Sequence, residues 1–166
     1  MRAALGIRMH SGWGVLVAVS GDASSMKLLD RRRMVVVDSA TPGTTQPYHH
    51  AAGLALHESE KHLATCVASS TQLASVVLSQ AVRELTERHY RIVGAAVLLA
   101  SGRPLPPLEK ILTAHPLIHT AEGEFFRQTV RQACQDLQIS VLAIRERDLP
   151  ERAKTAFGKA ASRRDV

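Results

Sequence analysis

The sequence is short of aromatic residues, of cysteine and of long apolar runs, and each shortage excludes a class of protein. Cys66 and Cys134 are the two cysteines, and they form neither a Cys-x-x-Cys pair nor a disulfide framework, so we expect free thiols in a reducing cytoplasm. The aliphatic run Val15 to Val19 is shorter than the roughly 7–15 apolar residues of a secretory signal. No segment approaches the roughly 18 apolar residues of a membrane span, so no membrane partner is expected.

The remaining composition is that of a folded domain with an excess of positive charge. Apolar residues make up 45% of the 166 residues and charged residues 22%, which excludes collagen-like, coiled-coil and strongly disordered chains. We expect one domain over residues 1–150, followed by a terminal helix and basic tail over 151–166. The net charge is 21 − 15 = +6, and residues 151–166 contribute 5 − 2 = +3 of it. This excess of positive charge favours a polyanionic partner. It does so less strongly for residues 1–150 than for the tail, because the tail carries half of the excess in far fewer residues.

The first third of the chain has the pattern of three strands. Residues 3–10 alternate apolar and polar or small side chains, a turn rich in Gly follows, and residues 15–19 are aliphatic. Residues 26–37 end in a β-branched run after another turn. The simplest arrangement is an antiparallel meander.

From residue 47 the pattern changes to helices separated by two apolar strands. Helical spacing covers residues 48–68 and 71–89, with an interruption or kink expected at Ser69-Ser70-Thr71. The remaining predicted elements are a buried strand over 92–99, a short helix over 107–115 stopped by Pro116, a long helix over 120–137 with Thr120 as its N-cap, a last buried strand over 140–144 and a terminal helix from 149.

This order of elements resembles the ribonuclease H-like superfamily. Leu5-Gly6-Ile7-Arg8-Met9-His10-Ser11-Gly12 is similar to the first-strand motif of its Holliday-junction resolvase and actin-like ATPase branches: apolar residues around a Gly, a charged residue, and a Gly turn. The resemblance implies an α/β fold with a mixed five-stranded sheet, three antiparallel strands followed by parallel strands, and helices on both faces.

The sequence departs from this superfamily at the positions that would bind metal. Active nucleases of the superfamily carry an Asp where this chain has Arg8, because divalent cations are held by carboxylate oxygens. The end of the fourth predicted strand also lacks an acid. Set against the resemblance, these two departures imply a domain of this superfamily that does not cleave nucleic acid. The candidate ligands for a phosphate are then Arg8, His10, Ser101 and Arg103. The alternative for Arg8 is an ordinary ion pair with a carboxylate.

His119 and Glu122 form a second candidate site. They are three residues apart, so they would be neighbours on the first turn of the long predicted helix, as a general acid/base pair or part of a metal site. Gly123 inside a helix suggests close backbone packing or an approaching ligand there. The alternative is an ordinary helix start in which acidic residues favour the helix dipole.

The other histidines give weaker metal patterns. His50 and His57 are seven residues apart and would align on a helix, so they could form a two-histidine site completed from elsewhere. His57 and His62 are five apart and miss the His-Glu-x-x-His spacing. No strong metal or nucleotide motif is present, and the cofactor is therefore unknown.

Trp13 lies in the first predicted turn, where it could stack on a base or cover the core. The sequence as a whole favours a non-nucleolytic domain that binds nucleic acid or another phosphate-bearing ligand. A hydrolase using a His/Glu acid-base pair or a single metal, and a protein-interaction subunit, are the alternatives. Whether the chain is an enzyme or a homo-oligomer stays open.

Overall fold

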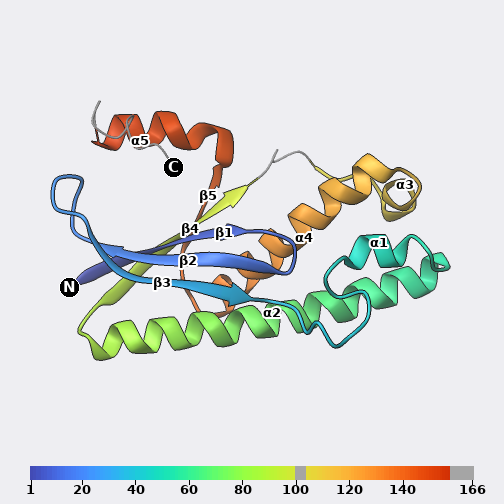
Figure 1. Cartoon of the computed structure of the whole chain (residues 1–166), viewed down its shortest axis with the longest axis horizontal. Helices are drawn as coiled ribbons and strands as arrows, with labels where there is room; N and C mark the ends of the chain where they lie inside the picture. Colours follow the sequence, from blue (N-terminus) through green and yellow to red (C-terminus); the bar gives the residue numbers. More distant parts are fainter. Residues whose placement is uncertain (100–103, 158–166) are drawn as a thin grey trace.

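Five strands form one mixed sheet in the computed structural model, which describes residues 1–99 and 104–157 (Figure 1). The strand order is β3-β2-β1-β4-β5; β1, β2 and β3 pair antiparallel, while β4 is parallel to β1 and β5 is parallel to β4. The strands are β1 Arg2–Met9, β2 Trp13–Ser20, β3 Lys27–Val35, β4 Arg91–Leu99 and β5 Val141–Arg145. These strand directions are the ones predicted.

The sheet has two unlike faces because its strands alternate. Leu5, Ile7 and Leu16 are buried on the inner face, which packs against two long helices. Arg8 alternates with these buried residues along β1 and pairs with Val15 of β2. Its side chain therefore points to the other face of the sheet, which we call the outer face. The hairpin between β1 and β2 turns at Gly12, whose φ of +76° suits a residue without a Cβ.

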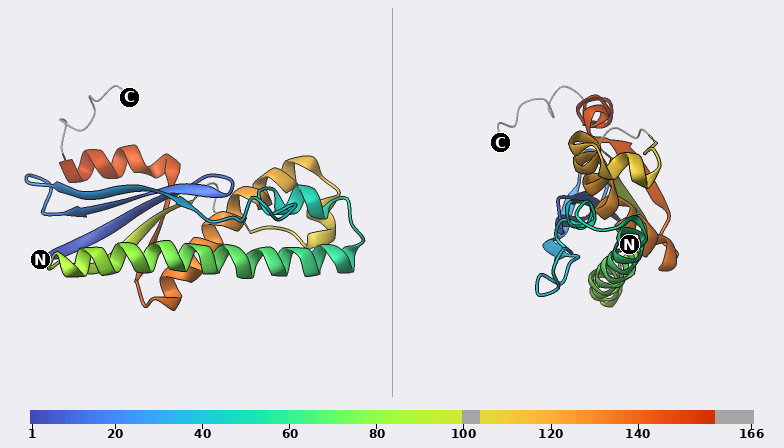
Figure 2. Two further views of the ribbon diagram at one scale, coloured as in Figure 1. Left: turned by 60° about the horizontal axis from the view of Figure 1, so that its bottom comes forward. Right: turned by 90° about the vertical axis from the view of Figure 1, so that its right-hand side faces the viewer.

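The helices lie on both sides of this sheet. They are α1 Pro47–Ala51, α2 Leu56–Glu87, α3 Leu108–Leu112, α4 His115–Asp136 and α5 Leu149–Phe157, with a 3₁₀ turn over Glu146–Asp148. Figure 2 shows α2 and α5 on opposite sides of the strands, and the side chains of α4 join α2 in the core of the inner face. The predicted fold class, a ribonuclease H-like α/β sheet with helices on both faces, is confirmed by this topology.

Both long helices end in the same backbone motif, which returns the chain to the sheet. His89 after α2 and Gln138 after α4 adopt φ values of 63° and 58°. The amides of Tyr90 and Ile139 donate to the carbonyls of Leu85 and Cys134, five residues earlier. This is the Schellman arrangement, which satisfies carbonyls that the helix leaves unpaired.

The interruption expected at Ser69-Ser70-Thr71 is wrong, because α2 is continuous from Leu56 to Glu87. Ser70 is buried within it. Serine and threonine lower helix propensity by well under 1 kcal/mol each, and packing of the apolar side chains of α2 against the sheet outweighs this. No described helix has both the length and the apolar character that a membrane crossing needs.

The predicted start of the long helix near Thr120 is also wrong. α4 begins at His115, with Pro116 in its first turn, and the short helix before it ends at Leu112. Proline is tolerated in the first turn, where its missing N–H would have no helical partner. Pro116 therefore starts a helix here instead of stopping one, and both His115 and His119 lie on α4.

Candidate functional site

α1 and the first turns of α4 lie beyond the end of the sheet and pack on each other (Figure 1). A small apolar cluster of Ile111, Ile118 and Ala121, with Tyr48 against it, holds this end together. The ring of Tyr48 also meets Phe125 edge-on, at 6.3 Å between centroids. The buried Ser59 hydroxyl of α2 donates to the carbonyl of Ala51 at 2.8 Å, which fixes the end of α1. Local packing therefore sets α1 against α4.

Three histidines meet where α1 and α4 touch. His115 and His119 are four residues apart on α4, so their side chains share one face, and their Nε2 atoms lie 2.9 Å apart. His49 of α1 approaches from the other side, with its ring centroid 4.8 Å from that of His119 and 5.7 Å from that of His115. One nitrogen of each ring lies within 4.8 Å of the other two.

Glu122 lies one turn below this cluster and is buried, with 4% of its surface exposed. Its Oε2 accepts a hydrogen bond from the Tyr48 amide at 3.0 Å and lies 3.3 Å from Nδ1 of His49. Its Oε1 is buried without a hydrogen-bond partner among the described residues. Glu122 therefore contacts His49 of α1, whereas the predicted acid/base pair joined it to His119.

Burial raises the pKa of Glu122, and the hydrogen bonds from His49 and Tyr48 oppose this rise. A carboxyl group whose pKa is raised by folding stabilises the protein at low pH and loses that contribution as pH rises through the folded pKa. Wild-type protein should therefore lose stability relative to Glu122→Gln as the pH rises above 4.5, the ordinary pKa of a glutamate side chain. Urea unfolding of both proteins at several pH values, in chelator-treated buffer, measures the difference.

The exposed Glu60→Gln is the matched control, because it removes a carboxyl group from α2 without changing a buried site. Its stability should follow the wild-type pH dependence. Parallel pH profiles for wild type and Glu122→Gln would contradict the expected role of Glu122.

His50 and His57, the predicted metal pair, are not among the residues of this cluster. The ring of His50 lies against His62 at 4.5 Å, and Nε2 of His62 lies 3.5 Å from the sulfur of Cys66. Burial and the neighbouring His50 lower the pKa of His62, while burial and the charge of Glu122 raise the pKa of Cys66. Both shifts favour the neutral form of the group. His57 is exposed on α2.

The residues predicted to bind phosphate lie on the outer face, away from the histidines. Arg8 makes an ion pair of 2.7 Å with Glu146, with about half of each side chain exposed. His10 stacks on Trp13 at 4.4 Å, and the guanidinium of Arg33 lies 4.3 Å from the Trp13 ring. Arg8, His10 and Trp13 thus gather at one end of the sheet. Ser101 and Arg103 lie outside the described residues.

The outer face is hollowed beside Arg8. A depression of about 450 Å³ has an apolar floor formed by Val15, Val17, Ala96 and Leu98, with Arg8, His10 and Arg31 around it. Arg31 and Arg33 are both exposed, and within the described ranges neither is in an ion pair. The outer face therefore combines apolar surface with guanidinium groups.

Gly123 has a packing explanation. Arg127 donates from Nη1 to the carbonyl of Gly123 at 2.5 Å and from Nε to the carbonyl of Leu98 at 3.1 Å. A Cβ on Gly123 would lie 2.9 Å from that guanidinium nitrogen. Gly123 thus leaves room for a side chain that links α4 to the end of β4.

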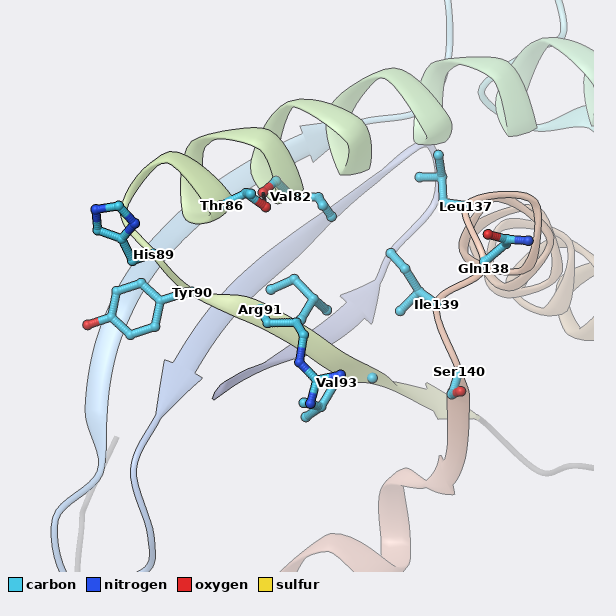
Figure 3. Close-up of a pocket in the computed structure, with 12 residues that line it drawn as sticks. Val82, Thr86, His89, Tyr90, Arg91, Val93, Leu137, Gln138, Ile139 and Ser140 are labelled. Carbon is cyan, nitrogen blue, oxygen red and sulfur yellow. Dashed lines mark hydrogen bonds between the residues drawn. The ribbon is translucent and has the colours of Figure 1, made fainter. Parts of the chain in front are cut away.

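A hollow of about 610 Å³ lies at the opposite end of α4 (Figure 3). His89, Tyr90, Leu137 and Gln138 are among its lining residues. Since α4 has 22 residues, roughly 30 Å of helix separates this hollow from His115. None of the candidate residues lines it.

Sequence reasoning left His115, Arg31 and Arg33 out of the candidate sites. His115 precedes Pro116, and the sequence pattern predicts the end of a helix there. The His-x-x-x-His spacing that begins beside a first-turn proline is nevertheless a usable signal. Arg31 and Arg33 belong to a run of three arginines inside a strand. Because successive side chains of a strand point to opposite faces, Arg31 and Arg33 lie on one face of the sheet and Arg32 on the other. There Arg32 forms ion pairs with Asp30 and Glu84.

No family model and no curated protein matches this chain. It is similar to solved structures at low identity. RuvC from T. thermophilus in complex with a Holliday junction substrate has 12% identity and a TM-score of 0.47 over 90% of this chain and 66% of that one. A second Thermus thermophilus RuvC structure has 11% identity and a TM-score of 0.40, over 94% and 80%.

A Ppx/GppA family member from Aquifex aeolicus has 12% identity and a TM-score of 0.38, over 87% of this chain and 35% of that one. The chain thus spans just under two thirds of the RuvC chain in the complex and about a third of the Aquifex protein. The order and directions of the five strands are those of a ribonuclease H-like fold.

Proposed function

We propose that this ribonuclease H-like domain binds nucleic acid on the outer face of its sheet and does not cleave it. The observation that carries this proposal is the depression of about 450 Å³ with an apolar floor and arginines at its edge. An apolar hollow suits an unstacked base, and guanidinium groups suit phosphate oxygens. A ligand carrying both groups matches the face better than a simple anion.

The spacing of the arginines supports contacts with a strand of phosphates. Arg31 and Arg33 alternate along β3, two residues apart, which separates their backbones by about 6–7 Å. Arg8 lies on β1, on the other side of β2. Arg8 and Arg31 line the depression from two sides, and the Arg33 guanidinium lies over the Trp13 ring. Trp13 and His10, already stacked, add an aromatic surface at the end of the strands.

The proposed absence of cleavage is supported by the residues of β1. This strand contains no Asp or Glu, and Arg8 pairs with Glu146. A guanidinium cannot bind a divalent cation, and metal-dependent phosphodiester cleavage needs such a cation beside the scissile phosphate. Binding without hydrolysis is therefore the activity that this face supports.

Binding can be measured by fluorescence anisotropy with labelled single- and double-stranded DNA and RNA across a salt series. The logarithm of the association constant should fall linearly with the logarithm of salt concentration, because phosphate contacts release counterions. Arg8→Ala should weaken binding and reduce the slope by about one. Arg83→Ala, an exposed arginine of α2 on the other side of the sheet, should change neither quantity.

Equal losses for Arg8→Ala and Arg83→Ala would show nonspecific attraction by net charge and reject this face as the site. No binding by the wild-type protein at about 50 mM salt would reject the proposal itself. The exposed Leu142 and Val35 on the sheet would then favour a protein partner instead.

A hydrolase is the second candidate function, favoured by the buried Glu122 beside His49. A carboxylate that orients an imidazole is a common element of acid/base and metal-assisted hydrolysis. His119 is exposed and lies next to His49, so it could contact a substrate. Hydrolysis that His119→Ala and Glu122→Ala together abolish would support this candidate, and hydrolysis that survives both changes would reject it.

A further inference from the structure

The contact between α1 and α4 holds a cluster of ligand nitrogens that nucleic-acid binding does not use. His49, His115 and His119 each offer one nitrogen within 4.8 Å of the other two. They come from two helices that packing holds together: Tyr48 is inserted against Phe125, and Ser59 bonds to Ala51. The cluster is thus convergent in three dimensions and partly ordered before any ligand binds.

We propose that His49, His115 and His119 bind one divalent transition-metal ion of the Zn²⁺ class through their imidazole nitrogens. Imidazole is a ligand for zinc and neighbouring transition metals, whereas magnesium and calcium prefer oxygen ligands. Three histidines leave one position of a tetrahedral ion to water or a substrate, which is the pattern of catalytic zinc sites.

The distances suit such an ion after a small adjustment. With zinc–nitrogen bonds of about 2.0–2.1 Å, two ligands of a tetrahedral site lie about 3.3 Å apart. The Nε2 atoms of His115 and His119 lie 2.9 Å apart. A slight rotation of either exposed side chain reaches the required separation, and the spacing of four residues on one helix matches a pair of metal ligands.

Glu122 determines how His49 would bind. Nδ1 of His49 lies 3.3 Å from Oε2 of Glu122, so Nδ1 carries the proton that points to the carboxylate and Nε2 is left as the ligand atom. Carboxylates behind metal-binding histidines fix the tautomer in this way. Because Glu122 is buried and its Oε1 lacks a described partner, a cation nearby would offset part of the cost of burying its charge.

The contact between His115 and His119 also fits a metal-binding pair. One Nε2–H can donate to the other Nε2 at 2.9 Å, so a single proton lies between the two nitrogens. Glu122 is the carboxylate that contacts the cluster, and it faces His49. A metal ion would replace the proton between the two Nε2 atoms and be bound by a lone pair from each. The geometry therefore assigns Glu122 as a positioning residue for His49.

The test is a titration of untagged, full-length protein with Zn²⁺, using a chromophoric chelator as competitor, and with Co²⁺, using visible absorption. One equivalent should bind, and four-coordinate Co²⁺ should give an intense visible band. His115→Ala and His119→Ala should each weaken binding by more than 100-fold, since a ligand contributes more than an outer-shell partner. Both side chains are exposed, so neither change should disturb the fold.

His57→Ala and His62→Ala are the controls, because they remove an exposed histidine and a histidine of the neighbouring His50–His62–Cys66 contact. Both should leave affinity and the Co²⁺ spectrum unchanged. Glu122→Gln should weaken Zn²⁺ binding by roughly 10–100-fold while the metal-free protein keeps its circular dichroism spectrum. A stoichiometry near zero Zn²⁺ ions per chain would overturn the proposal. Equal losses of Zn²⁺ affinity in the control variants and in His115→Ala would overturn it as well.

The titration is independent of the nucleic-acid assay. Metal binding that persists in Arg8→Ala, together with DNA binding that persists in His115→Ala, would establish two separate sites. Loss of Zn²⁺ binding in Arg8→Ala at unchanged stability would show that the metal is bound elsewhere and would reject the histidine site.

Discussion

Phe126→Ala should lower the free energy of unfolding by about 3–5 kcal/mol. Phe126 has 0% of its surface exposed and meets Phe125 edge-on, at 4.9 Å between centroids. It lies in the core between α4 and the inner face of the sheet. Removing the ring loses its burial and leaves a cavity that neighbouring side chains fill only in part. Urea unfolding monitored by circular dichroism measures the loss.

Val76→Ala on α2 is the appropriate comparison, because Val76 is 55% exposed and leaves no cavity. Its effect should stay within about 0.5 kcal/mol. A loss below about 1 kcal/mol for Phe126→Ala would mean that α4 does not pack against the sheet as described. Because α4 also carries His115, His119 and Glu122, that result would remove the scaffold of the proposed metal site as well.

Reversing the charge of Arg31 and Arg33 together should reduce the affinity for single-stranded nucleic acid by about 100-fold at low salt. Both side chains are exposed on the outer face, and Arg31 borders the apolar depression. Arg31→Glu with Arg33→Glu changes the local charge by four units, so two attractive contacts become repulsive. The effect should shrink as salt is raised, because exposed charges are screened. Anisotropy titrations at several salt concentrations measure it.

The control must change the net charge equally on another surface. Lys61→Glu with Arg83→Glu does so on α2, on the inner side of the sheet. It should reduce affinity far less than the change at Arg31 and Arg33. Similar losses for both double variants would show that only the total charge matters, and the outer face would no longer be a specific site.

The order of strands and helices follows from local patterns and could be predicted. Alternation of Leu5, Ile7 and Met9 with polar or small residues requires a strand with one buried face, and these three side chains are buried. The apolar run from Ile92 to Leu99 similarly predicts a strand inside the sheet, where β4 lies between β1 and β5. Such signals depend on each residue and its near neighbours along the chain.

The ends of elements were harder to predict because one residue type can start or stop a helix. The local pattern predicts that a helix stops at Pro116, yet this residue occupies the first turn of α4. It also predicts an interruption around Ser70, yet this residue is buried inside α2. Pro116 is tolerated because a first-turn N–H would have no helical partner. Ser70 stays helical because packing of α2 against the sheet outweighs a local propensity of under 1 kcal/mol.

By itself, the sequence determined the fold class, the lack of an acid on the first strand, and His119 and Glu122 as residues of interest. Only the tertiary structure decided that His49 and His115 join His119, and that Glu122 contacts His49. Residues 49 and 115 are far apart in the chain, so no periodicity relates them. Their meeting depends on how α1 packs on α4, which is set by the shapes of Tyr48, Phe125 and the small cluster around Ile118.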